Sequence, residues 1–191
     1  MNFEEYEDSW KGVDVCNQHL TAAHPRLKPV LRLVTGEVLD VGCATGGVTR
    51  MVDELDDVTG VVGVDFLPSA IEKARSLFLD RTTFVCESLE ELESDPFDTV
   101  LLLEFLHHTN TPQVALFAAR ELVAPGGRLI VTVPCRGSKV GGTVLRVYDR
   151  KSFGAEMAHA KTKGASVKIK EIKTGDHHDW LMAVVTYPEE N

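Results

Sequence analysis

One glycine-rich segment constrains the fold of this chain more than any other part of it. Residues 38–47 read VLDVGCATGG, and residues 48–55 then carry apolar side chains at helical spacing. This order predicts a strand, a tight loop and a helix, in which backbone N–H groups and a helix N-terminus face a ligand. Glycine suits such a loop because a Cβ would block the approach of the backbone or be strained at positive φ.

Short apolar segments alternate with helical periodicity along most of the chain. Strands are predicted at 38–41, 61–65, 82–86, 99–103 and 128–133, and helices at 48–55, 70–79 and 113–123. Pro125-Gly126-Gly127 is expected to end the last of these helices and turn the chain into the next strand. Residues 166–173 and 180–187 predict a terminal hairpin. The expected fold is therefore a three-layer α/β/α sheet of seven mostly parallel strands, with an antiparallel last strand.

Composition bears on partners and location. The formal net charge of −9 disfavours binding to nucleic acid, because an acidic surface repels phosphates. No apolar run approaches the roughly 20 residues that span a membrane, and the first residues lack a basic and apolar leader. The scattered cysteines contain no C-x-x-C pair and predict reduced thiols: Cys16, Cys43, Cys86 and Cys135. We therefore expect a cytoplasmic protein without a membrane partner, whose oligomeric state is open.

Two acidic residues accompany the glycine-rich turn. Asp40 lies two residues before the first glycine, and Asp65 closes the next predicted strand. Together with segments 97–108 and 120–129, this pattern closely resembles class I S-adenosylmethionine-dependent methyltransferases, whose fold is Rossmann-like. The resemblance is strong over about residues 36–134 and looser to about 187.

The resemblance implies one domain, 1–191, with S-adenosyl-L-methionine as cofactor. Its parts would be an N-terminal helical cap (1–35), a cofactor-binding core (36–134), an acceptor-side region (135–164) and a terminal β-hairpin (165–191). In the cap, Tyr6 and Trp10 lie at i, i+4, where they either pack on the core or form a lid.

The resemblance also assigns cofactor contacts. Asp40 would help to hold the ammonium group, and Asp65 would accept hydrogen bonds from the ribose hydroxyls. Ser88 stands where many family members carry an acid that binds the adenine amino group. The remaining expected contacts are the turn residues Gly42, Cys43, Ala44 and Gly46, the adenine neighbours Phe66, Leu67 and Leu89, and Leu103 beside the methyl-transfer site.

His107 and His108 follow the predicted fourth strand, where the resemblance places groups that face the acceptor. Adjacent histidines point in different directions, so at most one is expected to be catalytic, and we favour His108 as the base. The family's nucleic-acid amino-methylating motif is absent, since Leu103-Glu104-Phe105-Leu106 stands there. We expect in-line methyl transfer to a small molecule.

Other interpretations stay open. Gly42-x-Ala44-x-x-Gly47 with Asp65 further on also fits a degenerate dinucleotide fingerprint, which would indicate an NAD-dependent dehydrogenase. A non-catalytic methyltransferase-fold scaffold is a second alternative. Asp65 could instead cap a helix, and the histidines could simply pack. Residues 176–179 (DHHD) are read as a solvated hairpin tip and not as a metal site.

Overall fold

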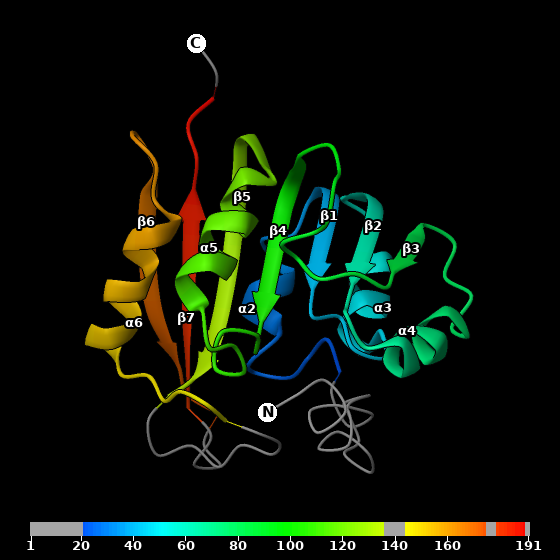
Figure 1. Cartoon of the computed structure of the whole chain (residues 1–191), viewed down its shortest axis with the longest axis horizontal. Helices are drawn as coiled ribbons and strands as arrows, with labels where there is room; N and C mark the ends of the chain where they lie inside the picture. Colours follow the sequence, from blue (N-terminus) through cyan, green and yellow to red (C-terminus); the bar gives the residue numbers. More distant parts are fainter. Residues whose placement is uncertain (1–20, 136–143, 175–178, 190–191) are drawn as a thin grey trace.

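A single seven-stranded sheet organises the part of the chain that the computed structural model describes, residues 21–135, 144–174 and 179–189. Its strand order is β3-β2-β1-β4-β5-β7-β6 (Figure 1). The strands are β1 (Gly36–Val41), β2 (Val58–Val64), β3 (Thr82–Val85), β4 (Phe97–Leu103), β5 (Val123–Pro134), β6 (Ser166–Ile172) and β7 (Trp180–Thr186).

The last strand alone runs against its neighbours. β1 pairs in parallel with β2 and β4, β2 with β3, and β4 with β5. β7 lies between β5 and β6 and is antiparallel to both. The predicted mostly parallel sheet with an antiparallel last strand is confirmed.

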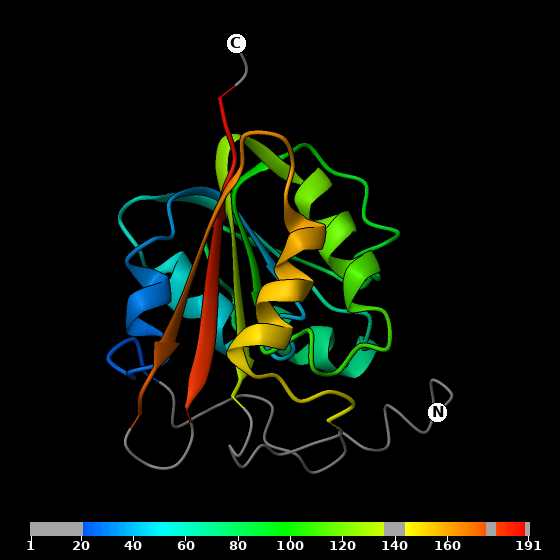
Figure 2. The same cartoon turned by 90° about the vertical axis from the view of Figure 1, so that its left-hand side faces the viewer.

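Helices cover both faces of the sheet. They are α2 (Lys28–Leu31), α3 (Gly47–Asp53), α4 (Pro68–Arg75), α5 (Pro112–Glu121) and α6 (Arg150–Glu156), followed by the 3-10 helix η1 (Met157–Ala160). Figure 2 shows α5 and α6 on one face and α2 and α3 on the other. Each face has its own buried apolar cluster, one containing Leu116 and Phe153 and the other Val30 and Val52. The sheet and the helices on its two faces form the three predicted layers.

The Pro-Gly-Gly segment differs from the prediction. It lies inside β5, which already pairs at Val123 with Phe97, and forms an irregularity before the pairing resumes at Arg128. The prediction that it turns the chain from helix to strand is wrong in this respect. Gly126 adopts a φ of 75°, and its N–H donates to the carbonyl of Pro188 at 3.0 Å. The Pro-Gly-Gly segment can stay in the sheet because Pro188, which follows β7, accepts the hydrogen bond from Gly126.

Several predictions fall partly outside the described residues. Of the predicted cap, residues 21–35 are described and contain the short α2, whereas Tyr6 and Trp10 lie outside. Of the predicted hairpin tip, 175–178 lie outside as well. Within the described ranges no cluster of metal-ligating side chains occurs, and no helix is long and apolar enough to cross a membrane.

Candidate functional site

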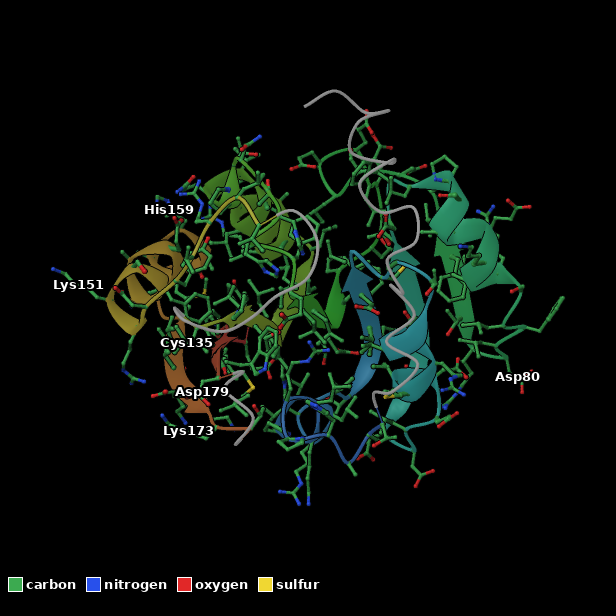
Figure 3. All side chains as sticks on the ribbon, turned by 90° about the horizontal axis from the view of Figure 1, so that it is seen from below. Asp80, Cys135, Lys151, His159, Lys173 and Asp179 are labelled. Atoms are coloured by element: carbon green, nitrogen blue, oxygen red, sulfur yellow. The ribbon has the colours of Figure 1, made fainter. Side chains whose placement is uncertain are left out.

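The candidate site lies at the carboxyl ends of β1, β2 and β4. β1 pairs with β2 on one side and with β4 on the other, so the strand order reverses there. Ligands of open α/β sheets bind outside the strand ends at such a point. Figure 3 shows the sheet from below, with Cys135, which directly follows β5, labelled. Gly42, Asp65 and Glu104 directly follow β1, β2 and β4.

The turn after β1 has a left-handed backbone. Gly42, Ala44 and Gly46 have φ values of 71°, 49° and 80°. The N–H groups of Gly42 and Cys43 both donate to the carbonyl of Val64, at 2.8 and 3.1 Å, which fastens the turn to the end of β2. A Cβ on Gly42 would lie 2.7 Å from Cδ2 of Phe105, so glycine is required there for space as well as for conformation.

Asp65 ties this turn to the start of α4. Its Oδ2 accepts a hydrogen bond from the N–H of Ala44, and its Oδ1 accepts one from the N–H of Leu67, both at 3.0 Å. Burial raises the pKa of Asp65, and its backbone hydrogen bonds, that from Leu67 foremost, oppose the rise. The carboxylate has about four lone-pair sites and can still accept a further bond. The side chain can therefore both fix the loop and bind hydroxyl groups.

Asp40 lies beneath the same turn. Its Oδ2 accepts a hydrogen bond from the hydroxyl of Thr49 at 2.6 Å, and it is 3% exposed. Burial raises its pKa to about 6; the bond from Thr49 lowers it and the charge of Asp65 raises it further. Among the described residues no lysine or arginine forms an ion pair with Asp40 or Asp65. Two neighbouring buried carboxylates without a protein cation favour a ligand that carries positive charge.

The expected adenine neighbours come from adjacent strand ends. Phe66 is 36% exposed, whereas Leu67 and Leu89 are buried. Because β2 and β3 pair in parallel up to Val64 and Val85, the segments that follow them emerge side by side. The hydroxyl of Ser88 donates to Oε2 of Glu91 at 2.7 Å, which leaves its oxygen to accept a hydrogen bond.

The sequence prediction did not include Glu104, the residue that follows Leu103 at the end of β4. Glu104 has a φ of 62°, its Oε1 accepts a hydrogen bond from the hydroxyl of Thr132 at 2.8 Å, and its Oε2 lies 3.8 Å from Nη1 of Arg26. Burial raises its pKa to about 7, although Arg26 and then Thr132 lower it. The sequence contains a signal that could have identified Glu104: like Asp65, it is an acid that directly follows an apolar strand.

The two histidines lie together, with ring centroids 3.9 Å apart. His107 is 2% exposed, and its Nδ1 has no hydrogen-bond partner within the described part of the chain. Burial lowers its pKa to about 3, helped by the charges of His108 and Arg26. His107 is therefore neutral at physiological pH and a weak base. His108 is partly exposed beside it.

Sequence relatives match the central part of the chain. A family model described as "Methyltransferase domain" matches residues 39–129, which include the turn, Asp65 and the end of β4. A ubiquinone biosynthesis O-methyltransferase from Xanthomonas euvesicatoria is 30% identical over 140 residues, 68% of this chain and 58% of that protein. One from Maricaulis maris is 35% identical over 108 residues, 53% of this chain and 42% of that protein. The chain thus spans about half the length of these curated relatives.

A solved structure shares the fold. DhpI, determined as a complex with SAH, superposes with a TM-score of 0.73 at 19% identity, over 98% of this chain and 93% of DhpI. The strand order, the glycine turn with its two carboxylates and the sequence relatives all indicate the same protein family. Residues 39–129 of this chain form a methyltransferase domain, and the chain is similar to class I S-adenosylmethionine-dependent methyltransferases.

Proposed function

We propose that this chain binds S-adenosyl-L-methionine and transfers its methyl group to a small molecule. The observation that carries the proposal is the pair Asp40 and Asp65, which is buried at the carboxyl ends of β1 and β2 and forms no ion pair with a lysine or arginine among the described residues. The cofactor has a sulfonium and an ammonium group, and a positive charge near these carboxylates would offset the burial and the repulsion from Asp65 that raise the pKa of Asp40. The family assignment disfavours the dehydrogenase alternative, in which Asp40 would instead lie near a pyrophosphate.

The donor set fits this cofactor. Asp65 has acceptor capacity left for the ribose hydroxyls beside the backbone bonds from Leu67, Ala44 and Phe66, because a carboxylate has about four lone-pair sites. The turn residues Gly42, Cys43, Ala44 and Gly46 would lie against the methionyl and ribose parts, and Asp40 would attract the ammonium group. Phe66, Leu67 and Leu89 would supply apolar surface to the adenine, and Ser88 one acceptor oxygen.

The end of β4 would form the acceptor side. The cofactor supplies an electrophilic methyl group, and the chain has to align the acceptor and receive a proton from it. Leu103 is half-buried there, and His108 stays a candidate for the acceptor side, whereas the low pKa of His107 argues against its acting as a base. The relatives are named O-methyltransferases, which supports a hydroxyl-bearing acceptor. The net charge of −9 argues against nucleic acid; cytoplasmic location stays a prediction.

A non-catalytic binding protein is the second candidate. It is favoured by Ser88, whose hydroxyl is bonded to Glu91 and which replaces the acid common in the family. Such a protein would bind the cofactor through Asp40 and Asp65 but turn over no acceptor. Binding without methyl transfer to a broad panel of hydroxyl compounds would support this alternative.

Calorimetric titration of the purified protein with S-adenosylmethionine, S-adenosylhomocysteine and NAD tests the proposal. We expect micromolar binding of the first two compounds and none of NAD. Binding of NAD alone would overturn the proposed cofactor, and binding of none would overturn both candidates. A radiolabelled methyl group on the cofactor then detects transfer to acceptors such as catechol and separates the enzyme from the binding protein.

A further inference from the structure

The segment that begins with Glu104 contacts both the turn after β1 and the neighbouring strand β5. Its neighbour Phe105 lies where a Cβ on Gly42 would come within 2.7 Å, so the chain just after β4 packs against the turn. Its own side chain reaches β5, because Oε1 accepts the hydrogen bond from Thr132. Glu104 therefore lies beside the proposed cofactor position and on the proposed acceptor side.

The backbone of Glu104 is strained. Among the described residues only Ala44, Phe78 and Glu104 have positive φ without being glycine, and two of these lie at this strand edge. The conformation is held by the N–H of Glu104, which donates to the carbonyl of Thr132 at 3.0 Å. A side chain of this type in the left-handed region is unfavourable and occurs where the surrounding structure fixes it, often at functional sites.

The partner of Glu104 is incompletely paired. Arg26 is 8% exposed, and its guanidinium lies 4.9 Å from the centroid of the Trp180 ring. Its Nε has no hydrogen-bond partner within the described ranges, and its Nη1 is 3.8 Å from Oε2 of Glu104, too far for a hydrogen bond. Within the same ranges Oε2 accepts no hydrogen bond. The guanidinium of Arg26 thus has a buried donor without a partner, and Oε2 of Glu104 beside this guanidinium, on a side chain that is 19% exposed, can accept a hydrogen bond. A ligand that bonds to both groups would offset the cost of the unpaired buried donor.

A hydroxyl group has the chemistry that completes both. As a hydroxyl it donates to Oε2 of Glu104, and as an oxyanion it accepts from Arg26. We propose that Glu104 takes the proton from a weakly acidic hydroxyl of the acceptor, such as a phenol, and that Arg26 holds the resulting oxyanion. This assignment rests on the proposed methyl transfer and names its substrate class and its base.

The proposed step balances. The acceptor O–H bond breaks and its proton passes to Oε2 of Glu104. The oxygen forms a new bond to the methyl carbon, while the carbon–sulfur bond breaks and its electron pair stays on sulfur. The proton then leaves Glu104 to solvent, and no oxidant or reductant takes part.

The electrostatics support this role. A pKa of about 7 lets Glu104 exist in both forms at physiological pH, which suits a general base. The groups that act on it are Arg26, which precedes α2, and Thr132 on β5. Trp180 on β7, which packs on Arg26, is not titratable. We therefore expect the rate of transfer to rise with pH through about 7, as Glu104 loses its proton.

The variants are Glu104→Gln, Glu104→Asp, Arg26→Met and Arg26→Lys, with the exposed Glu171→Gln as matched control. Calorimetry with S-adenosylmethionine first establishes that each variant keeps the cofactor site. Carbon-13 NMR of labelled glutamate carboxyls then follows the titration of Glu104 without turnover. The acceptor probe is 4-nitrocatechol, whose absorbance reports its ionisation, bound in the presence of S-adenosylhomocysteine.

We expect a carboxyl that titrates near pH 7 in the wild type and in Glu171→Gln, and its loss in Glu104→Gln. Arg26→Met should raise the apparent pKa of the bound probe, and Arg26→Lys should restore part of the shift. Transfer to catechol should fall about 100-fold or more in Glu104→Gln and recover partly in Glu104→Asp.

The outcomes separate the two proposals. If the wild type binds no S-adenosylmethionine, the proposed function fails, and the role of Glu104 fails with it. If the cofactor binds but Glu104→Gln keeps the wild-type rate and pH profile, only the assignment of Glu104 is overturned. If 4-nitrocatechol does not bind the wild type, or ionises equally in Arg26→Met, the named substrate class is overturned.

Discussion

Oδ2 of Asp65 accepts a hydrogen bond from the N–H of Ala44 at 3.0 Å, so the carboxylate that follows β2 holds a left-handed residue of the turn that follows β1. The same carboxylate accepts the N–H of Leu67. One side chain therefore shapes two loops that would meet the cofactor. Removal of the Asp65 side chain should therefore lower the stability of the protein even when no ligand is present.

Asp65→Ala should lower both stability and cofactor affinity. The variant leaves the N–H groups of Ala44 and Leu67 unpaired, each at a cost of about 1–3 kcal/mol if no water replaces the carboxylate. Affinity for S-adenosylmethionine should fall more than 10-fold because the ribose loses its acceptor. Chemical denaturation and calorimetry measure the two effects. Unchanged affinity would refute the ribose assignment, whatever happens to stability.

Asp40→Asn should flatten the dependence of stability on pH. The pKa of Asp40 is about 6 in the folded protein, above its ordinary 3.8, so the unfolded chain releases this proton first as pH rises. The contribution of the protonated group is complete below about pH 4 and is lost as pH rises through 6, by about 3 kcal/mol in total. Urea unfolding of both proteins at about pH 4 and about pH 8 tests this. A variant with the wild-type pH dependence would contradict the raised pKa.

Gly42→Ala should destabilise the turn and abolish tight cofactor binding. Alanine at a φ of 71° costs about 1–2 kcal/mol, and its Cβ would press on Phe105. Gly154→Ala is the matched control. Gly154 lies within α6, where alanine is favourable, and its added Cβ would meet only Cδ1 of Ile169, at an ordinary 3.7 Å. Thermal unfolding and calorimetry compare the two. Equal effects would mean that the turn does not require glycine.

His108→Ala should leave cofactor affinity unchanged and lower turnover modestly if His108 only helps to position the acceptor. Its pH profile should keep the rise near 7 that we assign to Glu104. Loss of that rise in His108→Ala, together with its retention in Glu104→Gln, would restore His108 as the base. Rate measurements over a range of pH with radiolabelled cofactor decide between the two residues.

The fold could be predicted because its signals are local. The alternation of apolar segments with helical periodicity, and the glycine turn with Asp40 and Asp65, lie in short stretches of sequence. The role of Pro125-Gly126-Gly127 was missed because the segment stays in β5 through a bond to Pro188, far along the chain. Sequence pattern does not contain such a partner.

The acceptor side was predictable only in position. The sequence directs attention to the histidines after β4, yet the low pKa of His107 comes from burial, which no short motif reveals. Glu104 acquires its properties from its left-handed backbone, from Thr132 and from Arg26. The stability role of Asp65 was likewise invisible, because its bonds to Ala44 and Leu67 depend on how two loops meet.

Because β7 lies between β5 and β6, the sheet cannot be completed before β7 has been synthesised. The turn after β1, Asp65 and the end of β4 are all synthesised in the first part of the chain and can assemble from contacts between neighbouring strands. Arg26, although made early, lies against Trp180, which is made near the end. Long-range pairing of this kind forms late. We therefore expect a nascent chain to form the strand ends that carry the cofactor turn first, and to bring Arg26 against Trp180 only after β7 has left the ribosomal tunnel.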